Sequence, residues 1–396
     1  MTNDTTVKAS TRRDIVKYGG AVVGGGLLAG CTGNGDPDTP EGTDSPDETS
    51  YSVEMSPVGD VTLEEPPTDV FTHFPWFADM ATALGQGDSI NNVWWDGTAS
   101  TLEYFTSDLE GVDIPWRDET ESYGFTKEQV YELDSDLHLV DPAWVTTQDN
   151  WTRADIDEVT NNVGSWLGNY YSNFHATPPD DWADGYEYYE LWELFERVAT
   201  LYREQSRYEA LASVRENMLE TIERERPPES DRPTVAYLSI STDLSAIYLL
   251  RLNAPGYFNA HSRPLGAVDA FGDEQWDGAF KQIDMEALLE ADPDAILALW
   301  TVTDAVDFEA MVQNLRDDPA GSELRAVNND RVYVQGTRWQ GPLMNLFQME
   351  MTAKQLYPEQ FGAWPRYENG DTYSVFDESE RLFDHQRLAD IINGDI

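Results

Sequence analysis

Short apolar runs alternate with amphipathic stretches along most of the chain beyond residue 66. The pattern predicts a strand over residues 69–72, a helix over 76–84 and a second strand over 90–95. An apolar strand followed by an amphipathic helix and another strand is the unit from which parallel sheets are built. The same pattern begins again at residues 234–239, after a long helical region. We therefore expect an α/β fold with mostly parallel central sheets.

The longest helical region lies near the middle of the chain. An apolar face runs through residues 191–202, and a second helix is predicted from near Ser206 to residue 225. Ser206 and Glu209 fit a capping box, and Pro227-Pro228 ends the helix. A helix of ~20 residues spans ~30 Å. That length is sufficient to bridge two lobes.

An internal repeat supports the presence of two lobes. Residues 126–139 align with residues 284–297, and each copy starts with a helix-capping residue, continues for two helical turns and enters a short apolar strand. The identical pairs are Glu128/Glu286, Glu132/Glu290, Asp134/Asp292, Asp136/Asp294 and Leu139/Leu297. We expect two similar lobes, each with a mostly parallel central sheet, bridged by one long α-helix.

The N-terminus has the features of an export signal. Arg12-Arg13 is a twin-arginine pair, residues 21–29 form a short apolar run, and small residues precede Cys31, the single cysteine. This order predicts export by the twin-arginine route and lipidation of Cys31, which would leave the folded body anchored outside the membrane. Simple cleavage near Cys31 remains an alternative. Either way, no thiol remains in the mature body for catalysis or disulfides.

These patterns divide the chain into six parts. We expect a signal with lipobox over 1–31, an acidic disordered linker over 32–65, an N-terminal α/β lobe over 66–203, the bridging helix over 204–228, a C-terminal α/β lobe over 229–365, and a segment over 366–396 that packs on the body.

The charge of the chain is extreme. Lys and Arg number 25 against 74 Asp and Glu, which gives a formal net charge of -49. Such repulsion destabilises a compact chain in dilute buffer, but molar salt shortens the Debye length to roughly 3 Å. With 40% hydrophobic residues the chain is globular, and it resembles proteins of halophilic archaea. Nucleic acid is excluded as a partner because no basic surface is available to offset its phosphates.

Taken in order, several segments carry a family resemblance over roughly residues 66–361. They are Ala83-Leu84-Gly85-Gln86-Gly87-Asp88, the two Glu-led repeats, and Val327-Asn328-Asn329-Asp330-Arg331-Val332-Tyr333-Val334. With the lipoprotein signal, this layout resembles the substrate-binding proteins of ABC importers for ferric siderophores, haem and cobalamin. The resemblance implies a monomer that captures a metal chelate and delivers it to a dimeric permease, without enzymatic activity or a cofactor.

The resemblance also implies two docking residues. By position in the repeated helix, Glu128 and Glu286 match the glutamates with which this family docks on permease arginines. Carboxylates on two similar lobes would make a two-point contact that sets orientation. The alternative is that both are ordinary first-turn helix acids stabilised by the macrodipole.

The ligand site is expected beyond the carboxyl ends of the strands, between the lobes. The candidates are His73, Trp76, Trp95, Trp144, Trp166 and Tyr170 in the first lobe, and Arg251, Tyr257, Arg263, Trp300, Arg338 and Trp339 in the second. A cleft lined with indoles suits a large, flat or partly apolar ligand. The arginines would hold an anionic chelate by bidentate contacts, unless each pairs with a neighbouring acid.

Two other functions stay open. His73, His175 and His261 lie in predicted loops, and with one carboxylate they would suit a bare divalent transition metal, although a paired-His motif is missing. A secreted hydrolase that uses paired carboxylates is the other alternative, because 74 acids allow many pairings. The sequence has no Gly-x-Ser-x-Gly, His-Glu-x-x-His or phosphate-binding glycine loop.

Overall fold

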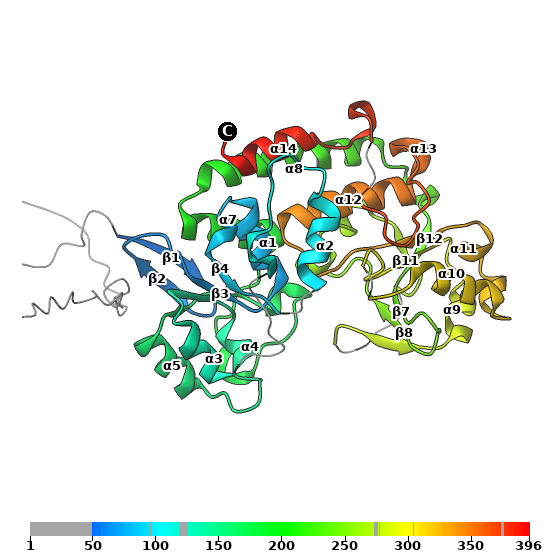
Figure 1. Ribbon diagram of the computed structural model, residues 1–396. Helices are drawn as coiled ribbons and strands as arrows, with labels where there is room; N and C mark the ends of the chain where they lie inside the picture. Colours follow the sequence, from blue (N-terminus) through cyan, green and yellow to red (C-terminus); the bar gives the residue numbers. More distant parts are fainter. Residues whose placement is uncertain are drawn as a thin grey trace, which may run out of the picture.

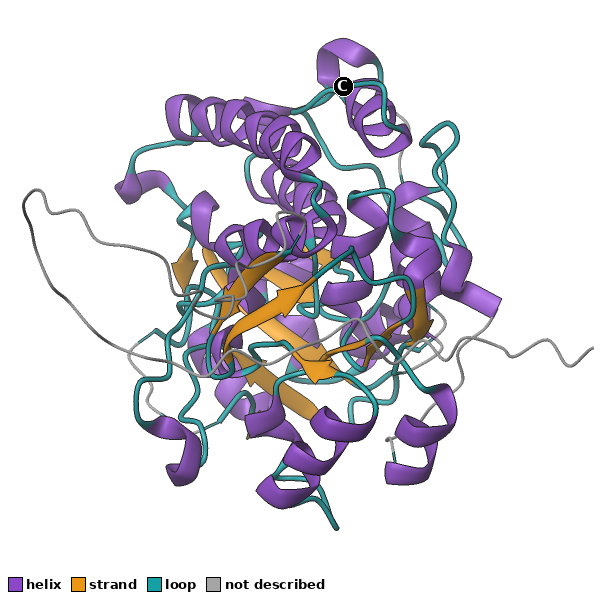
Figure 2. Ribbon diagram, turned by 90° about the vertical axis from the view of Figure 1, so that its left-hand side faces the viewer, coloured by secondary structure: helices purple, strands orange, loops and turns teal. Residues whose placement is uncertain are grey.

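The computed structural model describes residues 50–94, 97–118, 126–272, 276, 278–303, 305–373 and 376–396. Two lobes lie side by side, and helix α8 (Gln205–Glu225) extends along one side of both (Figure 1). Strands at the centre have helices on both sides (Figure 2). The predicted fold class is confirmed: an α/β protein whose two lobes each have a central sheet and are bridged by one long helix.

The N-terminal lobe has a fully parallel sheet in the order β4-β3-β5-β6. Its strands are β3 (Val70–Thr72), β4 (Ile90–Asn92), β5 (Leu137–Leu139) and β6 (Ser165–Trp166). Its helices are α1 (Pro75–Ala83), α2 (Gly97–Thr106), α3 (Lys127–Leu133), α4 (Pro142–Val145), α5 (Arg153–Asn162), α6 (Asp180–Ala183) and α7 (Leu191–Tyr202). Because the strands are parallel, all their carboxyl ends meet at one edge of the sheet.

The C-terminal lobe has a mixed sheet in the order β10-β8-β7-β11-β12, with β9 paired to β7. Strands β7, β9, β11 and β12 pair in parallel, whereas β8 pairs antiparallel with both of its neighbours, β7 and β10. The strands are β7 (Thr234–Ile240), β8 (Ile247–Leu250), β9 (Val268–Asp269), β10 (Lys281–Ile283), β11 (Ala295–Ala298) and β12 (Val332–Val334). The helices that follow β10 are α9 (Met285–Ala291), α10 (Phe308–Asp317) and α11 (Arg325–Asn328).

The two copies of the sequence repeat occupy equivalent places in the two lobes. Helices α3 and α9 each have seven residues and end at an aspartate in the left-handed region, with φ 45° at Asp134 and φ 39° at Asp292. The next aspartate of each copy accepts a backbone N–H at the start of the neighbouring strand region, 3.0 Å for Asp136 and Thr68, and 2.9 Å for Asp294 and Thr234. The two copies are therefore similar in structure as well as in sequence.

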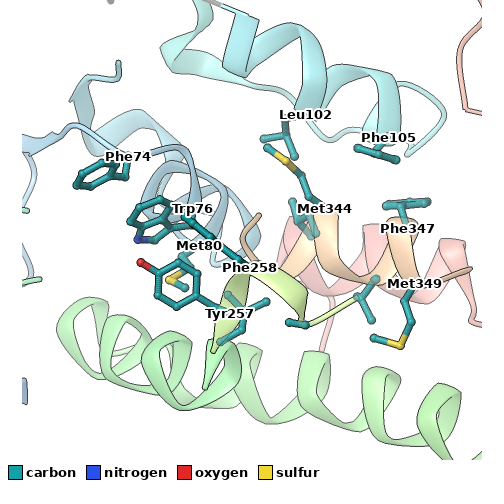
Figure 3. Close-up of a cluster of buried hydrophobic side chains, with 14 of the residues drawn as sticks. Phe74, Trp76, Met80, Leu102, Phe105, Tyr257, Phe258, Met344, Phe347 and Met349 are labelled. Atoms are coloured by element: carbon teal, nitrogen blue, oxygen red, sulfur yellow. The ribbon is translucent and has the colours of Figure 1, made fainter. Parts of the chain in front are cut away.

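Helix α12 (Pro342–Leu356) departs from the expected division of the chain. Although residues 229–365 were assigned to the C-terminal lobe, α12 packs against α1 and α2 of the N-terminal lobe. All of its residues are buried, and Figure 3 shows Met344 beside Leu102 of α2. A helix that is apolar on most sides must be enclosed on all of them. The junction between the lobes provides that enclosure.

The C-terminal segment packs on this central helix and on α8. It follows α13 (Pro358–Phe361) and contains α14 (His385–Asn393), which lies along α8. Buried Glu350 of α12 accepts from the hydroxyl of Tyr373 at 2.7 Å and contacts His385 Nε2 at 3.0 Å. Two residues of α12 thus hold the segment, since Lys354 Nζ donates to the carbonyl oxygen of Glu380 at 2.5 Å.

The linker prediction is wrong for its last third. Residues 51–63 form an antiparallel hairpin of β1 (Tyr51–Met55) and β2 (Gly59–Leu63), in which Val53, Met55, Val61 and Leu63 are buried. The alternation of apolar and polar positions is the strand signal that the composition of the whole segment obscured. The predicted signal sequence, with Arg12-Arg13 and Cys31, lies outside the described residues. Across the described ranges, no helix combines the length and apolar character needed to cross a membrane.

His138 provides a test of the N-terminal core. It is fully buried on β5, stacks on Trp166 at 4.5 Å, and burial lowers its pKa to about 4. Between pH 6.5 and 4 the unfolded chain therefore binds a proton that the folded chain excludes, so this stabilisation is lost as the pH falls. Its size is about 2 kcal/mol between pH 7 and pH 5.

We expect His138→Asn to be less stable than the wild type at pH 7, with the difference shrinking by about that amount at pH 5. Urea unfolding at both pH values, in constant molar KCl, measures it. A stability difference that is independent of pH would contradict the buried neutral imidazole.

Candidate functional site

A pocket of about 290 Å³ lies where the carboxyl ends of the strands of the N-terminal lobe face the loop after β12. Its lining residues are His73, Phe74, Trp94, Trp144, Gln148, Tyr170 and Trp339. The first six follow strands β3, β4, β5 and β6, and Trp339 comes from the opposite side. The site therefore lies at the edge of the sheets where open α/β folds bind ligands.

The pocket wall is a continuous set of aromatic rings. The imidazole of His73 stacks on Trp94, with ring centroids 5.4 Å apart, and lies 4.8 Å from Trp144. Trp94 meets Trp339 at 4.9 Å, and Trp300 follows Trp339 at 5.7 Å. The contact between Trp94 and Trp339 brings the two sides of the cleft together.

Burial keeps the imidazole in this wall neutral. It lowers the pKa of His73 to about 3, so that the ring carries no charge near neutral pH. A neutral imidazole stacked among indoles presents an apolar face to the pocket.

The structure brings together four of the predicted lining residues, namely His73, Trp144, Tyr170 and Trp339, with Trp300 beside them. Trp95 lies outside the described residues. Its neighbour Trp94 lines the pocket but was not among the predicted site residues. The same is true of Phe74 and Gln148. Consecutive strand residues point to opposite faces, so the pair Trp94-Trp95 signalled an indole at this edge without telling which one.

Trp76 and Tyr257 support the wall from behind and do not line the pocket. Both side chains are fully buried, and Trp76 lies between Phe74 at 4.4 Å and Tyr257 at 5.0 Å (Figure 3). The hydroxyl of Tyr257 donates to the carbonyl oxygen of Tyr170 at 2.9 Å. This hydrogen bond joins the C-terminal lobe to a lining residue of the N-terminal lobe.

The prediction for Trp166 is wrong. Its indole is buried in the core of the N-terminal lobe, where it stacks on His138 and donates from Nε1 to the carbonyl of Ile156 at 3.3 Å. The side chain points from β6 toward α5, away from the carboxyl edge of the sheet.

Two of the three predicted arginines have structural partners. Arg263 forms an ion pair with Glu190 and donates to the carbonyls of Ala254 and Gly256, each at 2.8 Å. Arg251 donates to the carbonyl of Trp276, with its guanidinium 4.6 Å above that indole ring. Their assignment to the ligand cleft is corrected, because nearby acceptors engage both side chains.

Arg338 differs from the other two. It is 5% exposed and lies between the rings of Phe258, at 4.4 Å, and Phe280, at 3.9 Å. Nη1 donates to the carbonyl of Ala279 at 3.2 Å, whereas Nε has no partner, and no carboxylate of the described residues pairs with this side chain. Burial lowers its pKa to about 10, with Tyr170 among the groups that interact with its charge. The guanidinium thus stays positive at neutral pH, next to a lining residue of the pocket.

The histidines do not form a metal site. His175 is exposed against Tyr188, and His261 is buried with Nδ1 2.8 Å from Nε2 of Gln340, so neither converges on His73. Within the described part of the chain, no group of three His, Cys, Asp or Glu side chains is placed to hold a metal ion.

Larger hollows lie elsewhere on the surface. Two of about 610 and 620 Å³ are on outer faces of the C-terminal lobe, and one of about 580 Å³ lies between α2, residues 302–303 and 305 after β11 and residues 370–372. None of them has rings converging from both sides of the cleft. The smaller aromatic pocket is therefore the candidate ligand site.

Two α/β lobes with a pocket at their junction define a bilobal solute-binding protein. The sequence profile of the periplasmic binding protein family matches residues 74–338, which is more than half of the chain. The chain belongs to this family. Membership places it among extracytoplasmic binding proteins that carry solutes to ABC importers.

Solved structures with the same fold include several iron-uptake proteins. A protein of the Fe3+-hydroxamate transport system of Saccharomonospora viridis is 18% identical, with a TM-score of 0.53 over 78% of this chain and 99% of its own. PiuA of Streptococcus pneumoniae is 16% identical, with a TM-score of 0.53 over 77% and 98%. FeuA of Bacillus subtilis, complexed with ferri-bacillibactin, is 16% identical, with a TM-score of 0.50 over 76% and 97%. No curated protein matches the chain.

The link between Tyr257 and Tyr170 is testable by removing one hydroxyl. We expect Tyr257→Phe to lower the free energy of unfolding by about 1 kcal/mol, because a buried carbonyl loses its donor while the ring keeps its packing. Chemical denaturation in molar KCl measures the change. Tyr248→Phe is the matched control, since that ring is 38% exposed. Equal losses in both variants would show that the buried hydroxyl has no particular role.

Proposed function

We propose that the protein captures an anionic iron chelate of the ferric siderophore type between its lobes and delivers it to an ABC permease. The observation that carries this proposal is Arg338, a buried guanidinium without an acidic partner among the described residues. A buried charge is costly unless it is paired. Acidic partners are abundant in a chain of net charge -49, yet none of the described acids pairs with this guanidinium. An anionic ligand would supply the missing partner.

The aromatic wall supports the same class of ligand. Indole and phenol rings bind flat or partly apolar groups through large contact areas. At about 290 Å³ the pocket is at the lower end of the size of small-molecule sites, so a bulky chelate would have to part Trp94 from Trp339. FeuA, which shares the fold, is described with a triscatecholate siderophore. A cobalamin-like ligand is the second candidate within this class.

Direct binding of a divalent metal ion has less support, because the three candidate histidines lie apart. A carboxylate-dependent hydrolase has no support in the aromatic pocket, because no Asp or Glu is among its lining residues.

Ligand binding is tested by the tryptophan fluorescence of the protein in molar KCl, titrated with ferric siderophores, haem and cobalamin. We expect a ferric siderophore to quench the emission, and Arg338→Gln to weaken its binding about 10- to 100-fold, because a hydrogen bond to a charged group contributes about 1.5–3 kcal/mol.

Arg251→Gln is the matched control, since that guanidinium is engaged with Trp276, and it should leave the affinity unchanged. Quenching by none of the chelates, or equal affinity in Arg338→Gln, would contradict the proposed function.

The permease contact is proposed for Glu128 and Glu286. Both are exposed at the second position of equivalent helices, after the caps Thr126 and Asp284. Helices α3 and α9 both lie on the side of the molecule opposite α8, one on each lobe (Figure 1). Two like carboxylates on one side suit a dimeric partner with a basic group on each subunit.

We expect the double variant Glu128→Lys/Glu286→Lys to abolish uptake in cells while its affinity for ligand stays unchanged. Glu216→Lys/Glu220→Lys makes the same change of charge on exposed positions of α8 and should transport normally. Transport assays and fluorescence titrations measure the two properties. A loss of affinity in the first variant, or equal loss of uptake in the second, would exclude specific docking.

The cellular setting is also a proposal. The order of Arg12-Arg13, an apolar run and Cys31 supports export in the folded state and anchoring through a lipid on Cys31. Residues 32–50 would then tether the body to the membrane. The net charge of -49 supports adaptation to molar salt, which screens the repulsion between its carboxylates.

A further inference from the structure

Arg338 and Trp339 lie in the turn that leads from β12 into α12, and this turn is held from the N-terminal lobe. The side chain of Asp79, in α1, is fully buried. Its Oδ2 accepts from the backbone N–H groups of Gly341 and Met344, both at 3.0 Å, and Oδ1 accepts from Leu343 at 2.9 Å. One carboxylate thus receives three hydrogen bonds from the start of α12.

The chemistry of a helix start explains this arrangement. The first N–H groups of a helix have no partner within it, and the macrodipole favours a negative charge beside them. The N-cap residue of α12 is Gly341, which has no side chain to accept these bonds. A Cβ atom at Gly341 would lie 2.5 Å from Cβ of Asp79. The glycine therefore permits the close approach by which Asp79 replaces a local cap.

Gln340 holds the same turn from the C-terminal lobe. Its Nε2 donates to the carbonyls of Tyr257 at 3.1 Å and Phe258 at 3.2 Å, and its Oε1 accepts from Asn345 at 3.1 Å. The ring of Phe258 in turn packs on the guanidinium of Arg338. The turn 338–341 is thus attached to both lobes by fully buried polar groups.

We propose that Asp79 is a positioning residue of the ligand site, which sets Arg338 and Trp339 at a fixed distance from His73 and Trp94. Helix α1 starts directly after His73 and Phe74, and it grips the turn through Asp79 one helical turn later. One short helix therefore connects both walls of the pocket. The effect on ligand affinity depends on the proposed function, whereas the effect on the geometry of the rings does not.

Two buried carboxylates make a matched test. Asp79→Asn keeps the shape but replaces one acceptor oxygen by a donor, facing N–H groups. Glu350→Gln changes a fully buried carboxylate on α12 whose partners are Tyr373, Leu382 and His385, away from the turn. Both should lower Tm. Because burial raises the pKa of Asp79 to about 7, the comparison is made at pH 8, in molar KCl, where the carboxylate prevails.

The first readout needs no ligand. Indoles as close as Trp94 and Trp339 couple in ultraviolet circular dichroism, and the spectral change common to Trp94→Phe and Trp339→Phe identifies their contribution. We expect Asp79→Asn to lose most of this coupling and Glu350→Gln to keep it. If Asp79→Asn does not fold, Gly341→Ala displaces the turn from Asp79 and should cause the same loss. The proposal would be overturned if Asp79→Asn or Gly341→Ala kept the coupling of the indoles, or if Glu350→Gln lost it equally.

The second readout is affinity, with a ferric trihydroxamate and a ferric tricatecholate as probes. We expect Asp79→Asn to bind the better probe at least about tenfold more weakly and Glu350→Gln to bind it as the wild type does. Unchanged affinity in Asp79→Asn would overturn the positioning role. If the wild type bound neither probe, the proposed function would fail, and the coupling of the indoles would still decide the role of Asp79.

Discussion

The buried start of helix α12 constrains the rest of the structure. Its backbone N–H groups lie at the junction of the lobes, out of reach of water, and such groups must find acceptors inside the protein. Asp79 supplies them from one lobe, while Gln340 attaches the preceding turn to the loop of Tyr257 in the other. Separating the lobes at this point would break these buried hydrogen bonds as well as part the apolar surfaces around them.

Other contacts around the junction have the same consequence. Tyr257 is bonded to the backbone of Tyr170, and Arg263 pairs with Glu190. The loops of the two lobes are so close that a Cβ atom at Gly256 would lie 2.1 Å from the carbonyl oxygen of Ser172. Helix α8 and the C-terminal segment then cover the junction on one side. The pocket is consequently built into a nearly fixed frame, and ligand binding would require little ordering of the protein. What remains to move is the aromatic contact between Trp94 and Trp339 at the seam of the pocket.

The sequence was sufficient for the architecture but only partly for the site. Hydrophobic periodicity and the repeat around Glu128 and Glu286 predicted two lobes and a bridging helix, because these patterns report which faces are buried. Aromatic residues directly after strands were also found, since parallel strands bring their ends to one edge. The role of each arginine was not predictable: Arg263 and Arg338 both lie in predicted loops, and their different environments arise from partners distant in sequence. Asp79 was missed for the same reason, since its partners lie more than 260 positions away and it is one acid among 74 acidic residues.

The central claim, that the buried network holds the lobes in one arrangement before any ligand binds, is tested most directly by pulsed electron paramagnetic resonance. Spin labels on cysteines at Glu132 and Glu290, exposed equivalents on α3 and α9, would report the distance between the lobes once Cys31 is replaced by serine. Our account predicts one narrow distance distribution without ligand in molar KCl, unchanged when the ligand is added. A second, longer distance in the unliganded protein that disappears on binding would contradict it.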